Sequence, residues 1–298
     1  MQSIKVKVLT VFMSVIMVFS LFPALSSNAA TSGKCGDNLS YSVSNGTLYI
    51  SGTGAMYDFT YNKTNNTLNV PWGSELSKIN KIVIGDGVTS IGKYAFFGET
   101  NVTSIEWPTN GSLKSIRDYA FCGLIRITSI QLPKGLTSIG YCAFESCYDL
   151  VSVKFPSTLK TIGKGAFAYC YDLTKVWIPS KVTTIGNCAF QNCQALKSVT
   201  GGAGLVKIGN AAFRSFYKLS TFKISSKKLK KIDKCAFIYT SKLKTLYLKK
   251  TTKLTKKGVR GSLYLSSVKT VKVKKSKVKK YKKIFKKSNS GKKVKVKK

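Results

Sequence analysis

Apolar residues return along this chain at a fixed spacing, and they do so within the same six-residue motif. The motif starts with isoleucine and ends with Ala-Phe, and its seven copies begin at residues 91, 116, 139, 162, 185, 208 and 232. The copies are 23 to 25 residues apart. A period of this size is typical of a solenoid, in which each turn buries its apolar side against the neighbouring turns. The sequence therefore predicts a stack of coils.

Residues 149–171 show what one turn contains. Leu150, Val153 and Phe155 are apolar, polar residues lie between or beside them, and Pro156 follows. This alternation predicts one short strand per turn with an exposed face, which ends because proline cannot donate a hydrogen bond to a ladder. The motif comes next: its glycine is expected to permit a tight bend, and its alanine and phenylalanine are expected to pack inward.

The phenylalanines of the motif are expected to form one buried column, because each side chain packs on its copy in the next turn. The column comprises Phe96, Phe121, Phe144, Phe167, Phe190, Phe213 and Phe237. Three turns depart from the pattern. Arg117 and Asp233 replace the glycine of the motif, and Gly202 replaces the proline after the strand. Local bulges are expected at these places.

Both ends of the repeat region carry patterns that predict caps. On the N-terminal side, Asn45-Gly46 separates two alternating segments, which indicates a two-residue hairpin. On the C-terminal side, Val271 and Val273 alternate, the apolar residues of 278–285 fall on one helical face, and Val294 and Val296 alternate again. This order predicts strand, helix, strand and a closure of the last turn.

The repeated pattern L-x-x-V-x-I-P, then L-x-x-I-G-x-x-A-F-x-x-C, is similar to the BspA-like class of bacterial leucine-rich repeats. The segment NGTLYISGTGAMYDF with Pro71-Trp72 resembles the cap that precedes such repeats. The resemblance implies a β-rich solenoid, a leucine-rich repeat stack of short parallel strands with an N-terminal β-hairpin cap and a basic C-terminal cap. It also implies a secreted or cell-surface protein that binds a protein or glycan ligand.

The segment boundaries follow from these patterns. Residues 30–75 are expected to form the N-terminal cap, residues 76–250 a solenoid of about seven turns, and residues 251–298 the Lys-rich C-terminal cap. Residues 1–29 resemble a signal peptide, because two lysines precede an apolar run and small residues follow it. The alternative is an uncleaved anchor, since about eighteen apolar residues nearly span a bilayer. After removal of the signal no membrane span is expected.

The charge changes the picture of the C-terminal cap. The formal net charge is +39, and residues 223–298 hold 30 of the 50 Lys and Arg with a single acidic residue, Asp233. A secreted chain does not meet nucleic acid as its physiological partner, so an anionic cell-envelope polymer is the expected partner of this charge. The alternative is that the lysines only keep the open end soluble and unpaired. The predicted polyanion-binding residues are Lys272, Lys274, Lys275, Lys279, Lys280, Lys282, Lys283, Lys286 and Lys287.

The sequence contains few residues of the types that catalytic sites use. The chain contains no histidine, which excludes Ser-His-Asp and Cys-His pairs and any zinc site that needs imidazole. Its eleven acidic residues are scattered without a repeated pairing. We therefore expect no enzyme, no cofactor and no metal site.

The cysteines follow the repeat. Cys147, Cys170 and Cys193 share one offset, and Cys142, Cys188 and Cys235 share another, whereas Cys35 and Cys122 share neither. Stacked copies whose side chains point in parallel suit a ladder of buried free thiols better than disulfides, although disulfides remain the alternative.

The strand positions that face outward are the expected ligand-binding surface, because successive turns present successive side chains there. The candidate binding residues are Glu106, Gln131, Lys154, Lys175, Trp177, Thr200, Lys223 and Tyr247. Trp177 stands out, since an exposed tryptophan is often a contact hot spot; the alternative is that a loop covers it. These features favour an adhesin-like binding protein. The second hypothesis is a structural envelope protein held electrostatically by its Lys-rich C-terminus, and the third is an enzyme or enzyme accessory.

Overall fold

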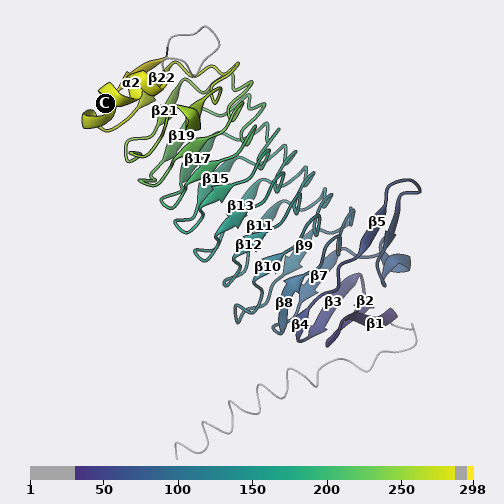
Figure 1. Ribbon diagram of the computed structural model, residues 1–298. Helices are drawn as coiled ribbons and strands as arrows, with labels where there is room; N and C mark the ends of the chain where they lie inside the picture. Colours follow the sequence, from purple (N-terminus) through teal and green to yellow (C-terminus); the bar gives the residue numbers. More distant parts are fainter. Residues whose placement is uncertain (1–30, 286–293) are drawn as a thin grey trace, which may run out of the picture. The chain divides into compact units, whose positions relative to one another are not determined.

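The computed structural model describes residues 31–285 and 294–298, and these residues form the stack of short parallel strands that the repeat predicts (Figure 1). The predicted signal peptide lies outside the described residues, so its presence and cleavage stay a prediction. No helix in these two ranges is both long enough and apolar enough for a membrane crossing.

The N-terminal cap begins with three antiparallel strands, β1 (Thr31–Gly36), β2 (Leu39–Ser44) and β3 (Thr47–Gly52). The predicted hairpin is confirmed: Asn45 and Gly46 join β2 to β3 with φ of 47° and 72°, the left-handed pair that a type I′ turn needs. β3 then pairs in parallel with β7 (Lys81–Ile84). The cap therefore supplies the first parallel neighbour for the stack. A separate hairpin, β5 (Thr60–Asn62) and β6 (Thr67–Asn69), and a short 3-10 helix, Gly73–Glu75, complete it.

Each central turn contributes two strands rather than the single strand predicted. The longer strands are β9 (Ser104–Glu106), β11 (Ser129–Gln131), β13 (Ser152–Lys154), β15 (Lys175–Ile178), β17 (Ser198–Gly201), β19 (Thr221–Ile224) and β21 (Thr245–Tyr247). The shorter strands form a second parallel sheet. They are β4 (Gly54–Ala55), β8 (Val88–Ile91), β10 (Ser115–Ile116), β12 (Ser138–Ile139), β14 (Thr161–Ile162), β16 (Thr184–Ile185), β18 (Lys207–Ile208) and β20 (Lys231–Ile232). Most of these strands have only two residues, which is too short for alternation to be recognised in sequence.

The phenylalanine column is confirmed. All seven side chains are fully buried, and consecutive rings are stacked with centroids 5.0 to 5.8 Å apart and planes within 20° of parallel. Trp72 of the cap stacks on Phe96 at 5.7 Å and so extends the column into the N-terminal cap. The rings thus form one continuous aromatic stack within a core that otherwise consists mostly of Ile, Leu, Val and Ala side chains.

The glycine of the motif has another role than the one expected. A Cβ on Gly163 would lie 2.3 Å from the carbonyl oxygen of Gly140 in the preceding turn. Glycine at position 163 therefore permits the close approach of these two stacked backbones, and the bend itself lies two residues later. That bend position has positive φ in each copy and is occupied by Tyr94, Tyr119, Cys142, Gly165, Cys188, Ala211 and Cys235.

The bulges expected at Arg117, Asp233 and Gly202 are absent from the described strands. The Arg117 N–H donates to the Ile91 carbonyl at 3.1 Å, as Gly140 does to Ile116 at 2.8 Å, and β10 keeps its register with both neighbours. β20 also pairs in register with β18, and β17 pairs with β15 and β19 through Gly201. The departures are absorbed because inter-turn hydrogen bonds use the backbone, which is the same in every residue.

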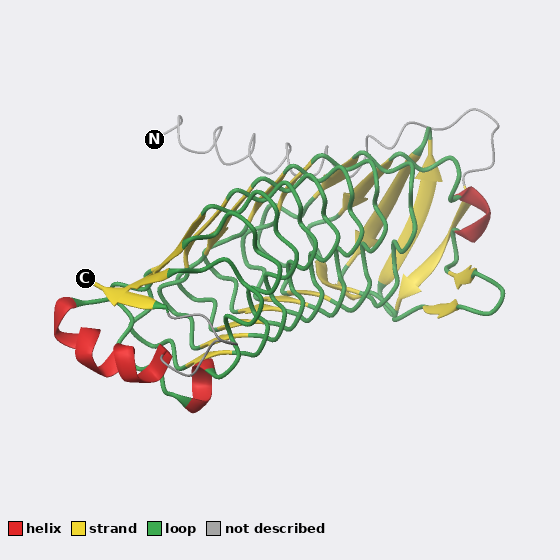
Figure 2. Ribbon diagram, turned by 90° about the horizontal axis from the view of Figure 1, so that it is seen from above, coloured by secondary structure: helices red, strands yellow, loops and turns green. Residues whose placement is uncertain are grey.

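The C-terminal end is the predicted strand, helix, strand: β22 (Thr270–Lys272), α2 (Val278–Phe285) and β23 (Lys295–Lys297). Both strands pair in parallel, so they extend the sheet of β11 to β21. Tyr281, Ile284 and Phe285 are buried, and the Tyr281 hydroxyl donates to the Thr251 carbonyl at 3.1 Å. Two 3-10 helices, Lys257–Val259 and Lys275–Lys277, lie in this cap, whose helices occupy one end of the stack (Figure 2).

Truncation of a central ring should show how much the column contributes. We expect Phe167→Ala to lower the free energy of unfolding by about 3 to 5 kcal/mol, because it removes a buried aromatic ring that stacks on both neighbours. Urea denaturation followed by circular dichroism measures the change. Tyr217→Ala, at a side chain that is 53% exposed, is the control and should change stability little; equal losses in the two variants would contradict the column as the main core contact.

Candidate functional site

In the C-terminal half of the stack, the residues of the predicted outward row lie side by side in paired strands. Trp177 lies beside Thr200, Thr200 beside Lys223, and Lys223 beside Tyr247 in successive paired strands. Gln131 of β11 is paired with Lys154 of β13, in the two strands that precede the strand of Trp177. Lys175 belongs to the parallel row at the start of the strands, where it lies between Ser152 and Ser198.

Exposure differs along these rows. Gln131, Lys154, Lys175 and Lys223 are exposed, whereas Thr200 and Tyr247 are half-buried. Trp177 is 56% exposed, so the alternative that a loop covers it is wrong. The row therefore presents one accessible indole among polar and cationic side chains.

A glycine in the next turn, Gly201, shapes the surroundings of Trp177. Gly201 lies in β17, between Ile178 and Ile224 of the adjacent strands. A Cβ on Gly201 would come within 3.2 Å of the Trp177 Nε1 atom. The indole thus lies beside backbone that has no side chain, and no Cβ from the next turn covers it.

Glu106 does not join the row that contains Trp177. It lies in β9, which belongs to the N-terminal sheet, and its carboxylate pairs with Lys81 at 2.5 Å. At the other end, the Lys272 Nζ lies 5.6 Å from the centre of the Tyr247 ring. The candidate residues are therefore divided between two sheets.

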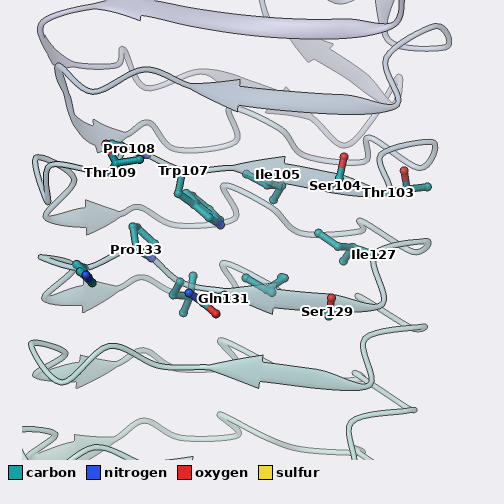
Figure 3. Close-up of a pocket in the computed structure, with 13 residues that line it drawn as sticks. Thr103, Ser104, Ile105, Trp107, Pro108, Thr109, Ile127, Ser129, Gln131 and Pro133 are labelled. Carbon is teal, nitrogen blue, oxygen red and sulfur yellow. The ribbon is translucent and has the colours of Figure 1, made fainter. Parts of the chain in front are cut away.

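The two sheets are separated by a break in the ladder of long strands, between β9 and β11, which the repeat pattern did not predict. The strands on either side continue in register, yet these two are not paired. A cavity of about 560 Å³, which we call the slot, opens between them and is lined by Ile105, Trp107 and Gln131 among others (Figure 3). Turn length alone does not identify the break: the motif copies at 91 and 116 are 25 residues apart, but β21, β22 and β23 follow one another at the same spacing and pair in register.

The Lys-rich end carries most of the predicted polyanion-binding residues. Six of them are exposed, namely Lys274, Lys275, Lys279, Lys280, Lys282 and Lys283, and Lys272 is half-buried. None of these seven forms an ion pair with another described residue. Lys286 and Lys287 lie outside the described residues. The charge at this end is thus available to an external anion.

The cysteines are all free thiols, including Cys35 and Cys122. The thiols of Cys147, Cys170 and Cys193 lie 3.4, 3.3 and 3.1 Å from the carbonyl oxygens of the column phenylalanines one turn earlier. Burial raises the pKa of the Cys147 and Cys170 thiols far above their ordinary value, which keeps them protonated and able to donate. Among the described residues no cluster of three Cys, Asp or Glu could hold a metal ion.

Glu99 occupies the position that Cys147 fills in a later turn, and sequence reasoning missed it. Its side chain is buried with 1% exposure, and the carboxyl oxygens and the Trp72 indole nitrogen, although neighbours, form no well-aligned hydrogen bond. Burial raises the pKa of Glu99 to about 8, and the neighbouring Trp72 indole offsets this only in part. Alignment of the repeats could have identified it, because it places this carboxyl in a column of otherwise buried residues.

Comparison with known proteins agrees with the architecture. The family model described as "BspA type Leucine rich repeat region (6 copies)" matches residues 74–194 and 160–292. A search of the curated proteins finds no relative.

Three solved leucine-rich repeat proteins are similar in structure. The protein from Bacteroides ovatus is 18% identical, with a TM-score of 0.52 over 84% of this chain and 71% of its own; this likeness concerns the fold alone. The protein from Eubacterium ventriosum is 20% identical, with a TM-score of 0.44, 83% of this chain and 79% of its own. The T. pallidum protein is 26% identical, with a TM-score of 0.46, 62% of this chain and 90% of its own.

The buried carboxyl should make stability depend on pH. Between its ordinary pKa of 4.5 and about 8, the folded state binds a proton that the unfolded state has released, so stability falls as pH rises through this window. Glu99→Gln, which mimics the protonated form, should flatten this dependence and raise stability at pH 8. Urea midpoints at pH 5, 6.5 and 8 measure it, and the exposed Asp149→Asn is the control. An unchanged pH profile in Glu99→Gln would contradict the assignment.

Proposed function

The chain belongs to the BspA type leucine-rich repeat family, and from this premise we propose that it is a secreted or cell-surface ligand-binding protein of adhesin type. The ligand is a protein or a glycan, held by the outward face of the strands. The observation that carries this proposal is the exposed Trp177 in a row of in-register polar side chains. A rigid row with one accessible aromatic ring suits a recognition surface.

A non-enzymatic role agrees with the chemistry of the described residues. Four carboxylates, those of Asp58, Glu75, Glu106 and Asp233, are held in ion pairs with lysine or arginine. Glu99 is enclosed in the core. The chain has no histidine, and these five carboxylates are either held by a cation or enclosed in the core, which supports a non-enzymatic role.

A second candidate function is supported by the Lys-rich end. Six exposed lysines gather on and beside α2 without a carboxylate among them. Such a cluster attracts a polyanion through summed charge rather than a shaped pocket. On this alternative the protein is a structural component of the cell envelope, retained on an anionic wall polymer.

Binding to arrays tests the first function. A protein and glycan array probed with the full chain should give a defined set of positive spots, and Trp177→Ala should weaken them by about tenfold or more, the effect of losing a hot-spot aromatic. Tyr217→Ala is the matched control, because this exposed aromatic lies away from the strand face. Signals that survive Trp177→Ala would contradict recognition through this row.

Salt tests the second function. The full chain should sediment with bacterial envelopes at low salt and be released near 1 M salt, where the Debye length falls to about 3 Å. Substitution of the six exposed lysines by glutamine should abolish sedimentation while folding is preserved. A control with six exposed repeat lysines replaced, Lys160, Lys181, Lys197, Lys218, Lys228 and Lys230, should still sediment. Retention of the tail variant would leave the lysines as a solubility device.

A further inference from the structure

The slot between β9 and β11 lacks the backbone hydrogen bonds that join every neighbouring pair of long strands. At the start of most strands, one N–H donates to the carbonyl of its counterpart a turn earlier: Thr103 to Asn80 at 2.9 Å, Val151 to Thr128 at 2.8 Å and Thr174 to Val151 at 3.1 Å. β21 also lacks this bond, at Lys244, but it stays paired with β19 further along the strand. The equivalent bond from Thr128 to Thr103 is absent, although both residues lie in the described part of the chain. Two strand edges therefore face each other without partners.

The slot also exposes core side chains that are covered in other turns. Ile105 is half-buried, whereas its counterparts Ile130 and Val176 are 4% and 2% exposed. Trp107 is likewise half-buried and packs edge-on against Phe121 at 5.4 Å. Figure 3 shows its ring extending from its own turn toward the turn that carries Gln131. The floor of the slot is apolar.

The opposite sheet does not share the break. β10 pairs with β8 and with β12 in regular register, so the turns remain stacked on that side. The opening is thus a local separation of one pair of strands within an intact stack, and its shape does not depend on a missing turn.

Most charged side chains around the slot are basic, although the exposed Asp86 carboxylate accepts hydrogen bonds from the N–H and the hydroxyl of Thr109, which lines the slot. Arg126, Lys134 and Lys154 are exposed and form no ion pair with a described residue, whereas Glu106 is already paired with Lys81. Arg126 precedes one end of β11, Lys134 lies past its other end, and Lys154 is paired with Gln131. An occupant with acidic residues is therefore favoured.

We propose that the slot binds an extended acidic peptide, which adds a strand between β9 and β11. A peptide strand is the ligand that supplies backbone donors and acceptors to both edges at once. Alternate side chains of that strand would point inward onto Ile105 and Trp107, and the others outward, level with Ser104 and Ser129. A glycan has no regular backbone ladder and leaves these edges unpaired.

The proposal deepens the proposed ligand-binding function and rests on it, but it concerns a separate place. Because the slot lies on the other side of Gln131 and Lys154 from Trp177, Trp177→Ala should leave slot binding unchanged. A negative result on the array and a negative result in peptide binding to the slot can therefore be told apart.

A library of random linear dodecapeptides displayed on phage, panned on the full chain, provides the probe. We expect enriched sequences in which apolar residues alternate and acidic residues are frequent. A synthetic peptide of the enriched sequence should slow hydrogen exchange at the Thr128 amide, which has no partner in the free protein. Absence of enrichment, or protection only at other amides, would overturn the proposal.

Two variants test the ladder itself. Thr128→Pro removes an N–H that has no internal partner, so we expect the thermal midpoint to be retained and peptide binding to fall by about tenfold or more. Val151→Pro, at the same offset one turn later, removes an N–H that donates to Thr128 and should lower the midpoint. If Thr128→Pro does not fold, N-methylation of alternate peptide amides gives the same test from the other side. Binding that is indifferent to N-methylation, or binding of arrayed glycans at the slot, would overturn it.

Discussion

The structure depends on one constraint: each turn has only its two neighbours to pack against, so it must present the same shape to both. The stacked rings from Trp72 to Phe237 satisfy this constraint in the core, and the backbone ladders satisfy it at the surface. The close approach of Gly163 to Gly140 follows from the same requirement. The sequence repeats at the positions that pack against neighbouring turns, whereas the outward side chains are free to vary.

The same rule decides how much sequence reasoning could predict. The phenylalanine column, the Asn45-Gly46 hairpin and the strand-helix-strand end were predictable, because each rests on local residue types in a fixed pattern. The outward position of Trp177 was predictable for the same reason. The second ladder of two-residue strands was not, since so few residues carry no periodicity of their own.

The break between β9 and β11 and the buried carboxyl of Glu99 show where pattern reasoning ends. Both depend on spacing in three dimensions: β9 and β11 are unpaired although other strands 25 residues apart are paired, and the cap brings Trp72 beside Glu99. Conversely, the substitutions Arg117 and Asp233 looked disruptive and were harmless, because the inter-turn bonds there are made by backbone atoms. Side-chain identity predicts the core well, whereas the pairing of two particular strands depends on backbone positions that the repeat pattern does not specify.

The fixed length of the turn also bears on how the chain acquires its structure. Bonds between turns join residues that are near one repeat apart, such as Thr137 to Lys114 and Gly163 to Ile139. Closing a loop of constant length costs nearly the same entropy each time, so every turn after the first pair is added at a similar cost and onto a ready template. Folding of such a chain resembles zipping from a nucleus that can form at several places. Trp72 and β3 give the cap a surface onto which the first turn can pack in the same way.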